Sequence, residues 1–251
     1  MKGFIREHKL HLLAFGVIGA IGGYFTGVMS AESLSPALLE EMIGQIGSLG
    51  LLYLVGTIQV LGYGVILGGI GILLAEKLGL WKPITFRVHG LRPALAVSVI
   101  GGLLLMLPDL LIFSQFEPWI MEMYTQKPTA AYLIACLTYG GVIEEIMMRL
   151  FLMSLLAFLL WKLAARTREQ VPDWCLVAAN VTTALLFAAA HLPATAAATA
   201  LTPVILLRCF LLNGGMGLLF GRLYRRHGIQ YAMLAHAGCH VVSKLIWILF
   251  L

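Results

Sequence analysis

The sequence carries little charge for its length. Of its 251 residues, only 12% are Asp, Glu, Lys or Arg, whereas 60% are hydrophobic. A soluble domain has roughly 25% charged residues, about twice this share. The mean hydropathy is +0.93, and a soluble fold of this size could not bury so much apolar surface. An ordinary soluble enzyme is therefore excluded, and lipid is expected to cover part of the protein.

The chain also lacks strand-like alternation, internal repeats, low-complexity linkers and a CxxC pair. The missing alternation argues against an outer-membrane barrel. The four cysteines stand apart, in or beside apolar segments, which argues against a disulfide framework or a zinc knuckle. No shift in composition divides the sequence. We therefore expect one integral membrane domain over residues 1–251, built as an all-α, polytopic transmembrane helix bundle around a buried polar cavity.

Long apolar runs define about seven spans of the bilayer. Several exceed about 20 residues, so tilt or an interfacial extension is expected. A short interfacial helix is predicted at 34–43, opened by Ser35-Pro36. The first run is longer than the hydrophobic core of a signal peptide, which favours an uncleaved first span. The seven runs are Leu10–Met29, Ile46–Ala75, Leu91–Phe113, Ala131–Trp161, Trp174–His191, Leu201–Phe220 and Ile229–Leu251.

The basic residues predict the orientation of these spans. With the N-terminus in the cytoplasm, thirteen of the 17 Lys and Arg residues fall on the cytoplasmic side, and the opposite loops hold Lys127 and several acids. This is the positive-inside pattern, so the net charge of +5 requires no nucleic-acid partner. We expect a multi-pass protein of the bacterial inner membrane, with lipid as a partner. The thirteen residues are Lys2, Arg6, Lys9, Lys77, Lys82, Arg87, Arg92, Lys162, Arg166, Arg168, Arg222, Arg225 and Arg226.

The fourth span carries three charged residues near its middle: Glu144, Glu145 and Arg149. Buried charges in a bilayer cost several kcal/mol unless they are paired or hydrated, so they indicate function. Glu145 and Arg149 are four residues apart on one helix face and are expected to form an ion pair. Glu144 is turned about 100° away and remains free to act as a general base or acid.

Histidines at helical spacing follow in the fifth and seventh spans. Phe187 and His191 are four residues apart, as are His236 and His240. Two imidazoles on one helix face can hold a metal, or they can hold a water and a developing oxyanion. A single buried histidine is more often a hydrogen-bonded core residue, but three histidines together with two adjacent carboxylates favour a functional site over a purely structural one.

Other polar residues within the spans are interpreted structurally. Asp109 is expected at the membrane interface, and Lys244 is close enough to the outer end to extend its amine to the interface. Arg208 either neutralises a carboxylate in the bundle or lies at a bend after Pro203.

The polar motifs resemble those of the CAAX protease and bacteriocin-processing family, also called the ABI family. Its eukaryotic members are the type II CAAX prenyl endopeptidases, or Ras-converting enzymes. The string from Glu144 to Arg149 resembles the family's EExxxR motif, and Phe187 to His191 resembles its FxxxH motif. His236 to His240 resembles its last motif, usually HxxxN. Motif order and spacing agree from about residue 139 onward, so the motif-bearing half is about 131–251.

The resemblance implies an intramembrane endopeptidase that cleaves a membrane-associated peptide or a prenylated, CAAX-type protein. Glu144 and His191 would activate water, His236 would polarise the scissile carbonyl, and Glu145 with Arg149 would brace the site. His240 replaces the usual Asn. Because His ligates metal, His191, His236, His240 and Glu144 could form a zinc shell, although a metal-free scheme is preferred.

Two questions remain open at the level of sequence. Straight helices would leave His191 toward the outer side and His236 toward the cytoplasmic side, so tilted or broken helices are required. Buried Glu and His residues also suit a proton-coupled transporter, and a relative without activity could serve in bacteriocin immunity or as a scaffold.

Overall fold

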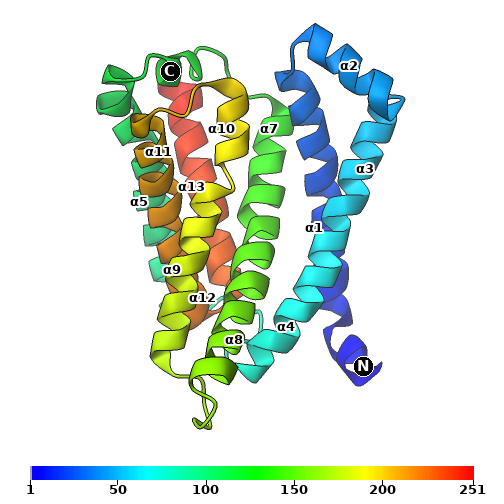
Figure 1. Cartoon of the computed structure of the whole chain (residues 1–251), viewed down its shortest axis with the longest axis vertical. Coiled ribbons are helices and arrows are strands. Elements are labelled where there is room, and N and C mark those ends of the chain that lie inside the picture. The colour runs from blue at the N-terminus through cyan, green and yellow to red at the C-terminus, as the bar shows by residue number, and fades with distance from the viewer. Residues whose placement is uncertain (1) are drawn as a thin grey trace.

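The computed structural model describes residues 2–251 and contains seven helical segments long and apolar enough to cross a membrane (Figure 1). The predicted polytopic helix bundle with seven spans is therefore confirmed. The first span is α1 (Lys2–Ser33), the second α3 (Leu49–Gly62), η1 (Tyr63–Leu67) and α4 (Gly68–Lys77), and the third α5 (Val88–Leu111), followed by η2 (Phe113–Gln115). The fourth is α7 (Ala130–Ala135), η3 (Cys136–Ile143), η4 (Ile146–Met153) and α8 (Ser154–Ala164). The fifth is α9 (Asp173–Ala189) and α10 (Leu192–Ala198), the sixth α11 (Pro203–Cys209), η5 (Phe210–Gly214) and α12 (Gly215–His227), and the seventh α13 (Ile229–Phe250).

Two short helices lie outside the spans. The first, α2 (Pro36–Ile46), begins as predicted after Ser35, whose hydroxyl accepts a hydrogen bond from the backbone N–H of Leu38 at 3.4 Å. Proline in the first turn suits this position, because the missing N–H would have no helical partner there. The second is α6 (Trp119–Glu122), between the third and fourth spans.

The fourth and fifth spans are not regular α-helices. The fourth contains two π-helical stretches, η3 and η4, on either side of Glu144 and Glu145. A π-helical turn contains more residues than an α-helical turn, and such insertions are frequent at functional sites. The fifth span is interrupted at His191, between α9 and α10. Bringing the motif histidines to one depth requires tilted or broken helices, and the irregularities of these two spans are of that kind.

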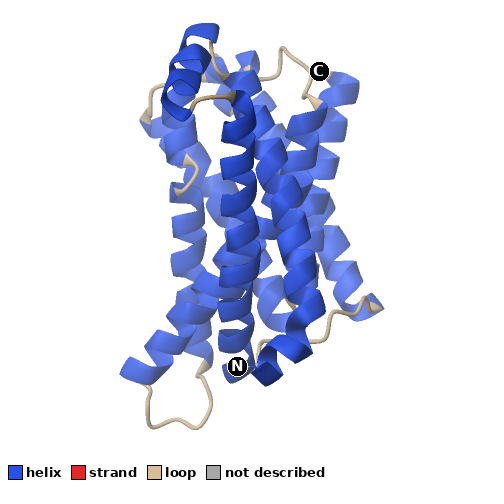
Figure 2. Cartoon of the chain, turned by 90° about the vertical axis from the view of Figure 1, so that its right-hand side faces the viewer, coloured by secondary structure: helices blue, strands red, loops and turns tan. Residues whose placement is uncertain are grey.

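Close backbone contact joins the first two spans. A Cβ atom on Gly23 of α1 would lie 2.9 Å from the carbonyl carbon of Gly56 in α3, closer than two packed groups allow. Small residues permit such approach in membranes, where van der Waals packing drives helix association. Figure 2 shows how the helices run side by side from one end of the molecule to the other.

The two ends of the bundle hold different parts of the chain. The N-terminus lies at one end, and α2 and the C-terminus lie at the other (Figure 1). At the N-terminal end, the loop before α5 binds the start of α13: Tyr231 donates a hydrogen bond to the carbonyl of Thr85 at 2.9 Å and accepts one from the N–H of Arg87 at 2.7 Å. In the same loop, Lys82 donates to the carbonyl of Arg226, and burial lowers the pKa of its amine. Two of the basic loops predicted to share one side, those before α5 and before α13, are therefore in contact.

Candidate active site

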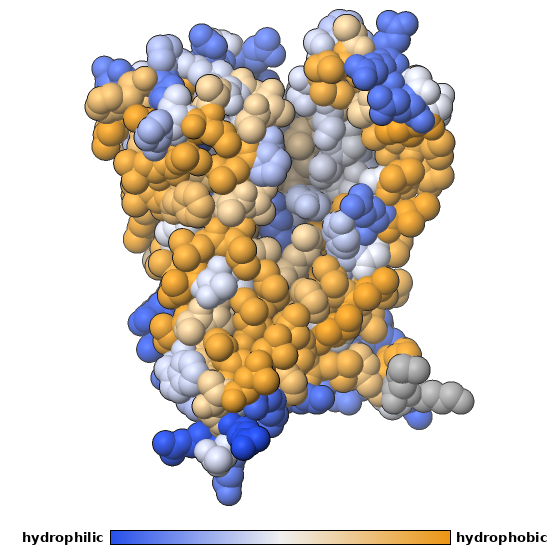
Figure 3. All heavy atoms as spheres, in the orientation of Figure 1, coloured by the Kyte–Doolittle hydropathy of each residue, from blue (hydrophilic) through white to orange (hydrophobic). Residues whose placement is uncertain are grey.

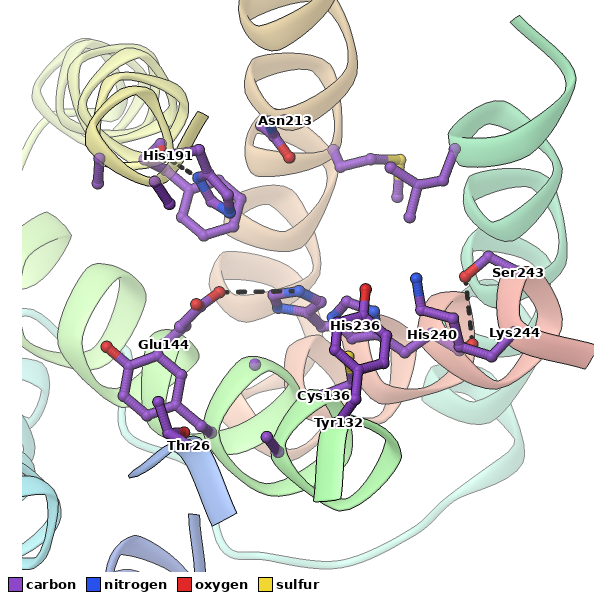
Figure 4. Close-up of a pocket in the computed structure, with 18 of the residues that line it drawn as sticks. Thr26, Tyr132, Cys136, Glu144, His191, Asn213, His236, His240, Ser243 and Lys244 are labelled. Carbon is purple, nitrogen blue, oxygen red and sulfur yellow. Dashed lines mark hydrogen bonds and ion pairs between the residues drawn. The ribbon is translucent and has the colours of Figure 1, made fainter. Parts of the chain in front are cut away.

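A cavity of about 610 Å³ lies within the bundle, and Glu144, His191, His236 and His240 all line it (Figure 4). Its volume is typical of small-molecule and cofactor sites, which span about 300–1,000 Å³. The π-helical fourth span and the interrupted fifth span bring together side chains that straight helices would hold at different depths. Glu145 is completely buried and does not line this cavity, so the two adjacent glutamates have different environments, as their angular separation predicts.

Glu145 joins the fourth and seventh spans through one oxygen atom. Its Oε1 accepts hydrogen bonds from Arg149 Nη1 at 2.8 Å and from His236 Nδ1 at 2.9 Å. Arg149 also donates to the carbonyl of Gly217 at 3.3 Å, and its guanidinium lies 4.4 Å from the centre of the Phe187 ring. The predicted ion pair is therefore present. Glu145 and Arg149 act on the cavity through His236, whose ring they orient.

His236 points its second nitrogen toward Glu144. Its Nε2 lies 4.0 Å from Glu144 Oε2, while the ring stacks on Phe220 with centroids 4.6 Å apart. Because Glu145 accepts from Nδ1, that nitrogen carries a proton and Nε2 faces the cavity. Orientation by a buried carboxylate in this way is a common device for setting the tautomer of a functional histidine. Phe220 was not singled out in the sequence, because an aromatic residue in an apolar run gives no local signal of such a contact.

His191 is held by its own helix. Its Nδ1 donates to the carbonyl of Phe187 at 2.7 Å, which leaves Nε2 free toward the cavity. The ring lies 4.8 Å from that of Phe187, so one aromatic residue contacts both His191 and the guanidinium of Arg149. A histidine whose Nδ1 donates to a carbonyl presents Nε2 as an acceptor, the form required to accept a hydrogen bond from a water molecule.

His240 stacks against His236, with ring centroids 5.0 Å apart. Gly140 of η3 faces its ring, and a Cβ atom at that position would lie 2.9 Å from His240 Nε2. The absence of a side chain at Gly140 thus leaves space for an imidazole where the resembling motifs have the smaller Asn. The Nδ1 of His240 is buried without a hydrogen-bond partner.

The donor atoms of the four cavity residues do not converge on one point. Within the described chain, the one group of three or more potential ligands whose donor atoms all lie within 4.8 Å of one another is Glu7, His8 and Glu76, at the N-terminal end. His236 already uses Nδ1 to bind Glu145. The zinc shell of His191, His236, His240 and Glu144 that the sequence allows is not among the groups that meet this distance, and it stays a prediction.

A second buried ion pair surrounds Asp109. This residue, predicted at the membrane interface, lies near the end of α5 and is completely buried within the protein. Asp109 accepts two hydrogen bonds from Arg208, at 2.6 and 2.5 Å, and one from Tyr124 at 2.8 Å. Burial, reinforced by the neighbouring carboxylate, raises the pKa of Tyr124. Arg208 thus neutralises a carboxylate within the bundle, one of the two alternatives considered for it.

The side chain of Lys244 lines the cavity, whereas the sequence predicted that its amine extends to the membrane interface. It lines the wall, with its Nζ 5.0 Å from the centre of the Tyr132 ring and 5.2 Å from that of Trp247. An apolar groove of about 180 Å³ between α7, η3 and α13 shares Cys136, His240 and Lys244 with the cavity. The fourth and seventh spans therefore form one wall of the site.

The arrangement defines a class of protein: a multi-pass membrane protein with one carboxylate and three imidazoles around a cavity within its spans. Residues 126–242 match the family model described as type II CAAX prenyl endopeptidase Rce1-like, which confirms the resemblance given by the motifs. All seven motif residues named above lie within the matched segment. The family supports CAAX-type intramembrane protease activity in general, acting on a membrane-associated peptide. No curated protein and no solved structure matches the chain.

Proposed function

We propose that the protein is an endopeptidase that hydrolyses a peptide bond of a membrane-associated substrate, with Glu144 and His191 activating the water. The observation that carries this proposal is the environment of Glu144. It is the one carboxylate among the described residues that line the cavity, and it faces His236 Nε2 at 4.0 Å. A carboxylate with an open space beside it, rather than a permanent partner, is available to a water molecule.

The proposed reaction begins with a water held between Glu144 and His191 Nε2. Glu144 takes one proton from this water while its oxygen attacks the carbonyl carbon of the scissile bond. A C–O bond forms, and the carbonyl oxygen becomes an oxyanion. The C–N bond then breaks, and the proton on Glu144 passes to the leaving nitrogen, so that one water is consumed for each bond cleaved.

His236 and His240 are the proposed donors to the oxyanion. While Nδ1 of His236 donates to Glu145, a proton on Nε2 is donated into the cavity. His240 supplies a second N–H from the adjacent turn of α13. Donors held in position before the reaction stabilise developing charge more effectively than solvent can, because they need no reorganisation.

The test is cleavage by the purified protein in detergent and in lipid vesicles, read by mass spectrometry. The substrates are a prenylated CAAX reporter and a set of membrane-anchored peptides. Glu144→Gln preserves shape and removes the base, so it should lower the rate by about 10²–10⁴-fold without altering thermal stability. Glu122→Gln, at an exposed position outside the cavity, is the matched control and should cleave normally. Undiminished cleavage by Glu144→Gln, or no cleavage of any peptide by the unaltered protein, would overturn the proposal.

A further inference from the structure

A group of potential metal ligands lies at the N-terminal end of the bundle, outside the central cavity. It comprises Glu7 and His8 of α1 and Glu76 of α4, none of which lines the cavity. The ends of α1 and α4 that carry them lie at the bottom of Figure 1. Figure 3 shows hydrophilic residues gathered at this lower end, beneath the apolar surface of the spans. The group has no part in the proposed hydrolysis, so its chemistry requires a separate account.

The geometry of the group suits a single divalent ion. One donor atom of each residue lies within 4.8 Å of the other two, and His8 Nε2 is 2.9 Å from Glu76 Oε1. Two ligand atoms that bind one ion at about 2.0–2.2 Å are themselves about 2.9–3.6 Å apart. Glu7 and Glu76 are both exposed, so small rotations of their side chains are enough to close the shell around an ion.

His8 is the fixed ligand of the group. Its side chain is only 3% exposed, and its ring packs against those of Phe4, His11 and Trp81, with centroids 4.6, 5.7 and 5.6 Å away. Its Nδ1 is buried without a hydrogen-bond partner, so the contact with Glu76 is its one hydrogen bond among the described residues. Burial of a polar ring is costly unless it is paired, and an ion on Nε2 compensates that cost more strongly than one hydrogen bond.

The two carboxylates have no cationic side chain as a partner. Among the side chains that the structure describes, no Lys or Arg forms an ion pair with Glu7 or Glu76. Lys77, the next residue along the chain, instead lies over the ring of Phe158, 5.5 Å from its centre. Two carboxylates and a neutral imidazole supply two negative charges, which match a divalent cation. The imidazole favours Zn²⁺ or a similar transition metal over Mg²⁺ and Ca²⁺, which prefer oxygen ligands.

We infer that Glu7, His8 and Glu76 form a binding site for a divalent transition-metal ion, with Zn²⁺ as the representative ion. The site joins the start of the first span to the end of the second, and its exposed carboxylates make it accessible from solvent. Its three ligands leave one position or more for water, which is compatible with tetrahedral zinc. The inference is independent of the proposed function, because the ligands are separate from the cavity.

Zinc binding by the full-length protein tests the site. Metal-stripped protein, purified in mild detergent without a polyhistidine tag, is dialysed against buffered Zn²⁺, and the bound zinc is measured by elemental analysis. Glu7→Gln and Glu76→Gln alter exposed side chains and should leave folding intact. Each should weaken one zinc site by more than the ~10–100-fold that loss of an outer-shell partner causes. Glu169→Gln, exposed in a loop, is the matched control and should bind zinc as the unaltered protein does.

The variants also distinguish this site from a zinc ion in the central cavity. A cavity ion would be lost in Glu144→Gln and retained in Glu7→Gln, whereas the inferred site has the opposite pattern. Because an ion that binds the folded state alone stabilises it, Zn²⁺ should raise the denaturation temperature of Glu144→Gln by more than that of Glu7→Gln. Zinc binding that is unchanged in both Glu7→Gln and Glu76→Gln, or that is lost only with Glu144, overturns the inference. The expected zinc pattern in a protein that cleaves no peptide would overturn the proposed function alone.

Discussion

The first two spans and the motif-bearing half of the chain use different physical chemistry. Helices α1, α3 and α4 pack through glycines and apolar side chains, and their principal polar contact is between His8 and Glu76, 2.9 Å apart near the cytoplasmic end. From α7 onward, charged and aromatic side chains meet inside the bundle around Glu145 and His236. The first spans thus supply a wall of the cavity, through Thr26 and Met29, whereas the proposed chemistry belongs to the second half.

This difference shows which contacts fix the positions of helices in a membrane bundle. Apolar packing in lipid is weakly directional, because lipid tails compete with apolar side chains for the same contacts. A hydrogen-bonded ion pair is directional, and breaking it within the spans is costly. Substitutions should therefore have their largest effects in the second half and their smallest effects between α1 and α3.

Breaking the central ion pair should have the largest effect. Arg149→Met leaves Glu145 buried without its cation and should lower the stability by about 3–5 kcal/mol. Loss of the stacking on Phe187 adds to this. The change is measured as a shift in the thermal denaturation temperature of the protein in mild detergent. Arg166→Met, at an exposed position, is the matched control, and equal stability of the two variants would contradict the assignment.

Replacing the second stacked histidine should act on activity more than on folding. His240→Ala removes a proposed oxyanion donor and should lower the rate by about 10²–10³-fold, measured by the same peptide assay. His240→Asn restores an amide donor and should retain most of the activity. Because Asn is not among the usual zinc ligands, an active His240→Asn protein would also argue against His240 as a metal ligand. Equal loss in both variants would contradict the donor role.

The glycine contact between α1 and α3 should have the smallest effect. Gly23→Ala forces the two backbones apart and should cost about 1–3 kcal/mol, with little change in the rate of the folded protein. Gly44→Ala, whose Cβ would meet nothing within 4 Å, is the control and should match or slightly exceed the unaltered protein in stability. A loss of cleavage in folded Gly23→Ala protein would show that the first spans contribute more than a wall.

Much of the fold could be predicted from the sequence because its signals are local. Long apolar runs give the spans, and basic loops give their sides. The spacing of Glu145 and Arg149 gives their pairing, since residues four apart share a helix face. The environment of Asp109 could not be predicted in this way. Its partner Arg208 is 99 residues away, and neither the spacing nor the composition indicates that the third and sixth spans adjoin.

The sequence by itself determined that this is a multi-pass helical membrane protein with its polar residues in the second half, since hydropathy, charge and helical periodicity act over a few residues. Only the tertiary structure decided that His236 binds Glu145 and that Gly140 leaves room for His240. These features depend on π-helical turns and a helix break that rotate and displace side chains. Their consequences appear only when distant spans pack together.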